Sequence, residues 1–134
     1  MSSEADLKRA LVKRLREVYP NFVIWRIEDP TTSGIPDITV VGRKVTSFWE
    51  VKHATPKFKV KGIQGRTMDL LAREGLAFYI IYCEKCDGAD KMTYIVDPKA
   101  IHNPPYTWAR RRIGFDHDWV VRQIGGLHHV DHSE

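Results

Sequence analysis

The chain has 134 residues, which is enough for one domain with a single buried core and leaves no room for a second catalytic module. Its hydrophobic fraction of 43% and charged fraction of 28% are those of an ordinary globular protein. No apolar run is long enough to span a bilayer, and the N-terminus lacks the basic-then-apolar signature of a signal peptide. We therefore expect a cytoplasmic, intracellular protein with no membrane partner, located in the host cytoplasm if the source is viral.

The first predicted element is a helix over residues 4–18. Ser3 is a suitable N-cap residue for it. Four apolar residues recur at helical spacing along this segment, namely Leu7, Leu11, Leu15 and Val18. Glu4 projects onto the same stripe, so we expect its side chain to face the interior of the protein. The alternative is that Glu4 only complements the positive end of the helix dipole.

Alternating and continuous apolar patterns predict the sheet. Five segments are read as strands, over residues 22–27, 36–41, 44–52, 76–82 and 92–96. The second and third segments are joined through Gly42-Arg43 as a hairpin, and a helix is predicted over residues 62–74. The element order α-β-β-β-α-β-β predicts an α/β fold with a mixed β-sheet of about five strands flanked by helices.

Structural signals weaken after residue 98, which divides the chain into three parts. Residues 1–98 are expected to form the core domain. Residues 99–126 are expected to form a C-terminal extension that packs on the core, with a short helix over 116–124. Gly125-Gly126 then releases residues 127–134, which we expect to be a flexible tail.

The residues that could carry chemistry lie where the second and third strands meet. Glu50 and Lys52 alternate onto one face of the third strand, and the hairpin can bring Asp37 beside them. Two carboxylates can hold a divalent metal, which stabilises charge on a phosphoryl group and activates a water. Mg²⁺ fits such a site because it takes few protein ligands. We therefore predict a metal-dependent centre that cleaves phosphodiesters; the alternative is a surface ion pair between Glu50 and Lys52.

Basic residues near this centre are candidates for contacting nucleic acid. The net charge of +4 is only weak support for a polyanionic partner, and each basic cluster alone is typical of a solvated surface. Two clusters beside a candidate phosphodiester site favour nucleic acid. The candidate contact residues are Lys57, Lys59, Lys61, Arg66, Arg110, Arg111 and Arg112.

The segment Gly34-Ile35-Pro36-Asp37, followed by Glu50-Val51-Lys52, resembles the PD-(D/E)xK nuclease superfamily. More narrowly, residues 4–82 resemble the virus-type replication-repair (VRR-NUC) nucleases, including the small stand-alone phage members. The layout is also similar to that of the archaeal Holliday-junction resolvases. This resemblance implies a restriction-endonuclease-like core. It also implies that Glu4 joins the metal site through water or a second ion, and that Gln64 orients a water or a phosphate.

The same resemblance implies a role for each residue of the central motif. Asp37 and Glu50 would hold the metal, with the backbone carbonyl of Val51 as a third ligand. Lys52 would position or polarise the attacking water. The expected cofactor is Mg²⁺, and we expect Mn²⁺ to substitute for it.

The activity implied by the resemblance is that of a DNA endonuclease that leaves 5′-phosphate and 3′-hydroxyl ends. Stand-alone family members act as homodimers on branched DNA, including four-way junctions, so we expect a homodimer that binds branched or duplex DNA. One alternative is a sequence-specific or single-strand nuclease. Another is a non-catalytic DNA-binding module with a nuclease fold, although the intact acid-acid-lysine set argues against it.

Cys83 and Cys86 have the spacing of half a zinc site or of a redox pair. There is no second pair of this kind, and distant histidines such as His102 or His117 would be needed to complete a metal site. We therefore expect a reduced pair in a turn, with a structural metal as the alternative. His53 alternates to the face opposite Lys52, where we expect packing or a phosphate contact.

Overall fold

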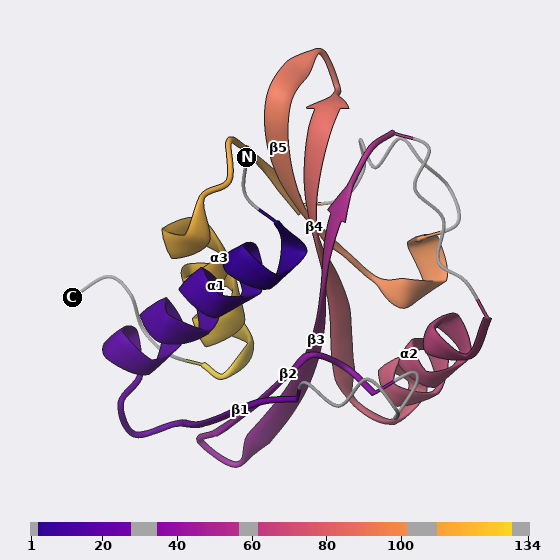
Figure 1. Ribbon diagram of the computed structural model, residues 1–134. Coiled ribbons are helices and arrows are strands. Elements are labelled where there is room, and N and C mark those ends of the chain that lie inside the picture. Colours follow the sequence, from indigo (N-terminus) through magenta and orange to yellow (C-terminus); the bar gives the residue numbers. More distant parts are fainter. Residues whose placement is uncertain (1–2, 28–34, 57–61, 102–109, 130–134) are drawn as a thin grey trace.

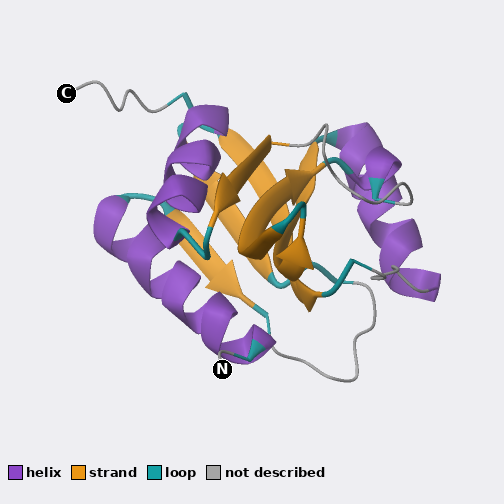
Figure 2. Cartoon of the chain, turned by 90° about the horizontal axis from the view of Figure 1, so that it is seen from above, coloured by secondary structure: helices purple, strands orange, loops and turns teal. Residues whose placement is uncertain are grey.

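The computed structural model describes residues 3–27, 35–56, 62–101 and 110–129, with the backbone alone for residues 62–64. Its elements are α1 (Glu4–Val18), β1 (Val23–Arg26), β2 (Ile38–Gly42), β3 (Val45–Ala54), α2 (Gly62–Glu74), β4 (Leu76–Cys86), β5 (Ala89–Val96), the 3₁₀ helix η1 (Pro98–Ala100), β6 (Arg110–Ile113) and α3 (His117–Leu127). The sheet lies between two helical layers (Figure 1). Figure 2 shows α1 and α3 on one face of the sheet and α2 on the other.

The sheet has six strands in the order β1-β2-β3-β4-β5-β6. Neighbouring strands are antiparallel except β3 and β4, which are parallel and are connected through α2. The prediction of a mixed sheet flanked by helices is therefore confirmed, but the expected count of about five strands was one too low. The additional strand is β6, which comes from the C-terminal extension and pairs with β5.

Helix α1 begins as its sequence predicts. The Ser3 hydroxyl accepts a hydrogen bond from the backbone N–H of Asp6, and the Asp6 carboxylate accepts one from the N–H of Ser3, which forms a capping box. Its buried residues are Leu7, Leu11, Val12 and Leu15. Val18, which the helical spacing groups with Leu7, Leu11 and Leu15, is exposed, so the buried arc is turned towards Val12.

The hairpin between β2 and β3 positions the residues of the central motif. Gly42 pairs with Val45, so the turn itself is Arg43-Lys44 and not Gly42-Arg43. Both turn residues have positive φ, 53° and 65°, as a two-residue hairpin loop of the type that matches strand twist requires. Gly42 serves a different purpose, because a Cβ atom there would run into the ring of Phe22.

The strands β4 and β5 are longer than the apolar pattern predicts. The ladder continues to the pair Cys86 and Ala89, and the turn between the strands is confined to Asp87-Gly88. Cys83 and Cys86 are joined by a disulfide, so the expectation of a reduced pair was wrong. Lys85 between them has a φ of 60°, and both cysteines are buried in the core on the α2 side of the sheet.

The C-terminal extension is part of the same core. Val120, Val121 and Ile124 of α3 are buried with α1 against one face of the sheet. Residue 127, where the tail was expected to begin, ends α3, and His128 is fully buried between the Ser47 hydroxyl and the Gly42 carbonyl. Residues 130–134 of the expected tail lie outside the described residues. No helix in the described part of the chain is long and apolar enough to cross a membrane.

Candidate active site

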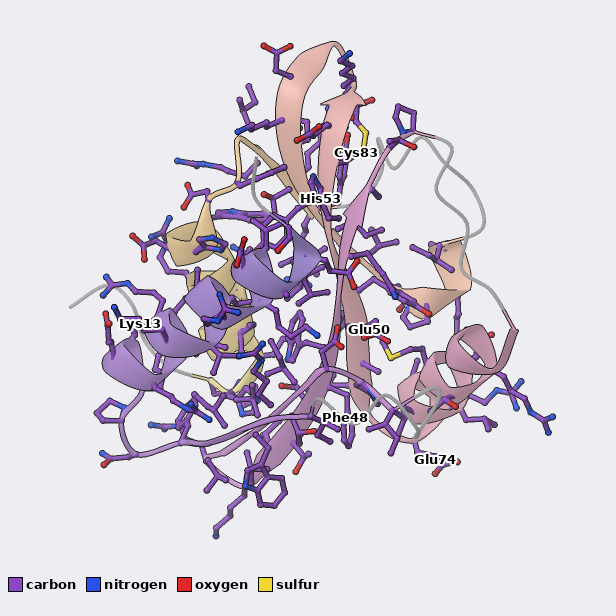
Figure 3. The ribbon with its side chains drawn as sticks, in the orientation of Figure 1. Lys13, Phe48, Glu50, His53, Glu74 and Cys83 are labelled. Atoms are coloured by element: carbon purple, nitrogen blue, oxygen red, sulfur yellow. A yellow bond between two sulfur atoms is a disulfide. The ribbon has the colours of Figure 1, made fainter. Side chains whose placement is uncertain are left out.

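The register of the hairpin determines which side chains meet at the candidate centre. Ile38 pairs with Trp49, and both belong to the core under α1 and α3. One step further along the same register, beyond the end of the ladder, Asp37 comes opposite Glu50, and its side chain reaches Lys8 of α1. Phe48 belongs to the core on the α2 side of the sheet, so Glu50 and Lys52 follow it on the same face. Figure 3 shows Phe48, Glu50 and His53 in order along β3.

The carboxylate of Asp37 is held by two other elements. Its Oδ2 atom accepts a hydrogen bond of 2.8 Å from the backbone N–H of Val51, so the carboxylate takes the place of a strand partner beside β3. Its Oδ1 atom lies 3.0 Å from Nζ of Lys8 on α1, and the two side chains are only 15% and 14% exposed. The Asp37 carbonyl accepts a further bond from the N–H of Ile27. These contacts fix Asp37 at the junction of α1, β2 and β3.

Glu50 lies in the middle of β3 and is 1% exposed. Its neighbour across the parallel ladder is Tyr79 of β4. Burying a carboxylate is costly unless the charge is paired, hydrogen-bonded or bound to a metal. Lys52, two residues further along the same face, is half-buried and pairs with Ile81 in the ladder. The structure therefore brings Asp37 against the strand segment that carries Glu50 and Lys52.

Glu4 faces the sheet, as its helical phase predicts, but it reaches a point beyond Lys52. Its Oε2 atom accepts a hydrogen bond of 3.3 Å from the backbone N–H of His53. The His53 ring lies edge-on to Phe115 and its Nε2 atom is 3.4 Å from Oε1 of Glu84, so this histidine packs as expected.

Lys8 is the residue of this centre that the sequence analysis missed. It lies on α1 one turn after Glu4, and at 100° per residue it falls between the buried Leu15 and Val12. A lysine inside a buried arc needs a carboxylate partner from another element. A lysine at a helical position between buried apolar residues therefore predicts a buried ion pair, but the sequence does not show which acid is its partner.

The oxygen atoms at this centre suit a hard divalent cation. Asp37, Glu50 and the Val51 carbonyl offer oxygen ligands only, which is the preference of Mg²⁺. Each oxygen of Asp37 already accepts one hydrogen bond, but a carboxylate has about four acceptor positions, so capacity remains. Within the described ranges no three His, Cys, Asp or Glu side chains cluster as a complete metal site. The set therefore fits an ion that keeps several waters.

The three consecutive arginines of β6 all contact the protein itself. Arg110 donates a hydrogen bond to Gln123 and lies over the Phe78 ring, 5.6 Å from its centroid, and burial lowers the pKa of its guanidinium. The other two face carboxylates, Arg111 with Asp87 at 3.8 Å and Arg112 with Asp116 at 3.4 Å. Two of these three positive charges, those of Arg111 and Arg112, are therefore balanced by acids within the fold.

The remaining predicted residues are only partly described. Arg66 is exposed on α2. Gln64 lies in the first turn of α2, but its side chain is outside the described part. Lys57, Lys59 and Lys61 also lie outside the described residues.

A basic cleft that the sequence analysis did not identify follows α1. It has a volume of about 370 Å³ and is lined by Arg9, Val12, Lys13, Arg16, Glu17 and Arg26. Four of these six side chains are cationic and one is anionic. The signal in the sequence was the spacing of Arg9, Lys13 and Arg16 along one side of the helix.

Comparison with solved structures finds a likeness of fold. The fold is similar to that of Archaeoglobus fulgidus Hjc, a Holliday junction resolvase from an archaeal hyperthermophile, with a TM-score of 0.49 and 16% sequence identity. The similarity covers 73% of this chain and 75% of that chain. No protein-family model and no curated protein matches the sequence. A function for this chain therefore depends on the residues of the candidate centre and on the motif that they form.

Proposed function

We propose that the protein is a metal-dependent DNA endonuclease of the PD-(D/E)xK type. The observation that carries this proposal is the placement of Asp37, whose carboxylate bonds to the backbone of β3 beside Glu50, with Lys52 next on the same face. This combination suits phosphodiester cleavage, because the two carboxylates can hold a cation and the lysine can contact a water or a phosphate oxygen.

Each residue has a distinct part in the proposed reaction. Asp37, Glu50 and the Val51 carbonyl hold a divalent cation, Mg²⁺ or Mn²⁺. The bound cation supplies charge neutralisation at the phosphate and a water that ionises near neutral pH. Lys52 donates a hydrogen bond to the attacking water or to a phosphate oxygen, where negative charge develops. The hydrolysis leaves 5′-phosphate and 3′-hydroxyl ends.

The charge of Lys8 reduces the repulsion between the carboxylates of Asp37 and Glu50. Two neighbouring carboxylates repel each other. The Lys8 ammonium at 3.0 Å from Asp37 offsets this repulsion and orients the carboxylate. In the same proposal, Glu4 contributes to the metal site through water or a second ion, and Gln64 orients a water or a phosphate.

The proposed substrate is branched or four-way-junction DNA, cut by a homodimer in the cytoplasm. The motif resemblance supports this substrate class, and the basic cleft along α1 provides a surface for the phosphate backbone. The second proposed contact surface comprises the basic residues Lys57, Lys59, Lys61, Arg66, Arg110, Arg111 and Arg112.

A second candidate function is a non-catalytic DNA-binding module. Two observations favour it: Glu50 is 1% exposed, and Lys8 already occupies one oxygen of Asp37. Such a module would use the ion pair to stabilise the fold and would bind DNA without cutting it.

Cleavage assays separate these functions. Labelled linear duplex, flap, single-strand and four-way-junction DNA are each incubated with the protein and Mg²⁺, and in parallel with EDTA. We expect Mg²⁺-dependent cuts, placed symmetrically near the branch point of the junction. Cleavage of the single strand alone would identify a single-strand nuclease. Cleavage of the duplex at one sequence alone would identify a sequence-specific nuclease. Binding without any cleavage would establish the non-catalytic module.

A further inference from the structure

Tyr79 occupies the position beside Glu50 on the central strand β4. The two residues are partners in the parallel ladder, so their side chains lie on the same face of the sheet, under α2. Tyr79 is 0% exposed, and its hydroxyl has no hydrogen-bond partner in the described structure. A buried hydroxyl without a partner is rare in folded proteins and indicates a water or ion that completes the site.

The other buried tyrosines show that this is not a general property of the core. Each of their hydroxyls has a partner: Tyr19 donates to the Val121 carbonyl at 3.1 Å, Tyr82 bonds to Nδ1 of His117 at 2.9 Å, and Tyr94 donates to Asp87 at 2.6 Å. The exception is the tyrosine that neighbours the candidate centre.

The electrostatic surroundings of Tyr79 indicate what its hydroxyl would contact. Burial raises its pKa well above the ordinary value, and the carboxylates of Glu50 and of Asp69 on α2 raise it further. The hydroxyl therefore lies in a negative potential. A negative potential attracts a cation and the waters that it carries, and a phenol oxygen can accept a hydrogen bond from such a water.

We propose that the Tyr79 hydroxyl accepts a hydrogen bond from a water of the divalent cation held at Asp37 and Glu50, and that the charge of Asp69 helps to attract that cation. The inference rests on the proposed function, since it places Tyr79 at the edge of the same cation site. Tyr79 is then a positioning residue: it holds the hydrated cation in place and touches neither the phosphate nor the cation directly. Removing a residue that contacts a metal site through a bound water or a ligand typically weakens metal binding by roughly 10- to 100-fold.

Tyr79→Phe tests the proposal because it removes the hydroxyl and keeps the ring. Tyr82→Phe is the matched control, since Tyr82 lies three residues along the same strand on the opposite face and its hydroxyl is satisfied by His117. Binding of Mn²⁺ alone to the full chain is measured by isothermal titration calorimetry, and the melting temperature is measured in EDTA. Asp69→Asn provides a second variant that changes charge at constant volume.

We expect Tyr79→Phe to weaken Mn²⁺ binding by about tenfold with an unchanged or raised melting temperature. Tyr82→Phe should lower the melting temperature and leave Mn²⁺ affinity unchanged, and Asp69→Asn should weaken binding as Tyr79→Phe does. If wild type binds Mn²⁺ and Tyr79→Phe binds it equally well, the inference fails and the proposed function stands. If wild type binds no Mn²⁺ even at millimolar concentration, both fail. A lower melting temperature at unchanged affinity would assign the hydroxyl to a structural water.

Discussion

The ion pair between Lys8 and Asp37 ties helix α1 to the start of β2. Both side chains are about 85% covered, so solvent screens the attraction much less than at the surface. Asp37 also accepts the N–H of Val51, which means that loss of Lys8 would leave a hydrogen-bonded but uncompensated carboxylate beside Glu50. The pair therefore links fold stability to the candidate centre.

Lys8→Met, which keeps most of the side-chain volume, should lower the free energy of unfolding by about 2 kcal/mol in EDTA, because one partner of a largely buried pair is removed. Urea denaturation followed by circular dichroism measures the change. Arg9→Met is the control, since the pair between Arg9 and Asp6 is exposed and its loss should matter far less. Equal destabilisation by the two substitutions would contradict the structural role of Lys8.

At the residue scale, the sequence was sufficient for side chains whose placement follows from one element. Strand alternation placed Glu50 and Lys52 on one face, and helical phase turned Glu4 towards the sheet. The contact between Lys8 and Asp37 and the unsatisfied hydroxyl of Tyr79 depend on how separate elements pack. Neither periodicity nor a local motif encodes such packing, so these two features required the structure.

The hairpin of β2 and β3 is the element that sets the register of the candidate centre. A slip of one residue would turn Glu50 to the opposite face. The two-residue loop Arg43-Lys44 and the contact of Gly42 with the Phe22 ring both oppose such a slip.

Adding a glycine at Lys44 and removing the glycine at Gly42 should change the free energy of unfolding in opposite directions. Lys44→Gly should raise the free energy of unfolding by about 0.5 kcal/mol, because Lys44 has a φ of 65° that glycine adopts without strain. Gly42→Ala should lower it by roughly 1–3 kcal/mol, because its methyl group meets Phe22. Thermal and urea denaturation measure both. A destabilised Lys44→Gly variant would refute the account of the turn.

At the element scale, strong periodicity predicted α1, α2 and the central strands with ends within a few residues. The strand β6 was missed because Arg110–Ile113 is charged and exposed, which is usual for an edge strand and gives no apolar pattern. The pairing of Cys83 with Cys86 depends on the backbone turn at Lys85, and the spacing of the cysteines alone left the pairing open.

At the scale of the whole molecule, the basic residues that are consecutive in the sequence are not those that line a basic surface in the fold. Arg111 and Arg112 of β6 face acids and Arg110 lies over the Phe78 ring, whereas the cleft along α1 has a cationic excess even though Arg9 pairs with the exposed Asp6. Chain order cannot show this difference, because the acids that balance β6 come from the β4–β5 turn and from the cap of α3. The cleft along α1 is therefore the stronger candidate for contact with the DNA backbone.

Replacing Arg9 and Lys13 together by Gln should weaken DNA binding at low salt and reduce the salt dependence of affinity by roughly two phosphate contacts. Fluorescence anisotropy of a labelled four-way junction at several salt concentrations gives both quantities. The paired substitution of Arg111 and Arg112 by Gln, which removes the same charge, should have the smaller effect. The reverse order would place the DNA on the β6 side of the molecule.

The measurement that bears most directly on the central proposal is the rate of Mg²⁺-dependent DNA cleavage by Asp37→Asn, taken together with its affinity for the same DNA. Lys52→Ala is measured in parallel. We predict that each variant cleaves at least about a hundredfold more slowly than wild type, because each loses a group that acts on the cation or the water, while DNA affinity changes little. The melting temperature of Asp37→Asn should fall, because Lys8 loses its charged partner, whereas that of Lys52→Ala should change little. Undiminished metal-dependent cleavage by either variant would contradict the assignment of the active site.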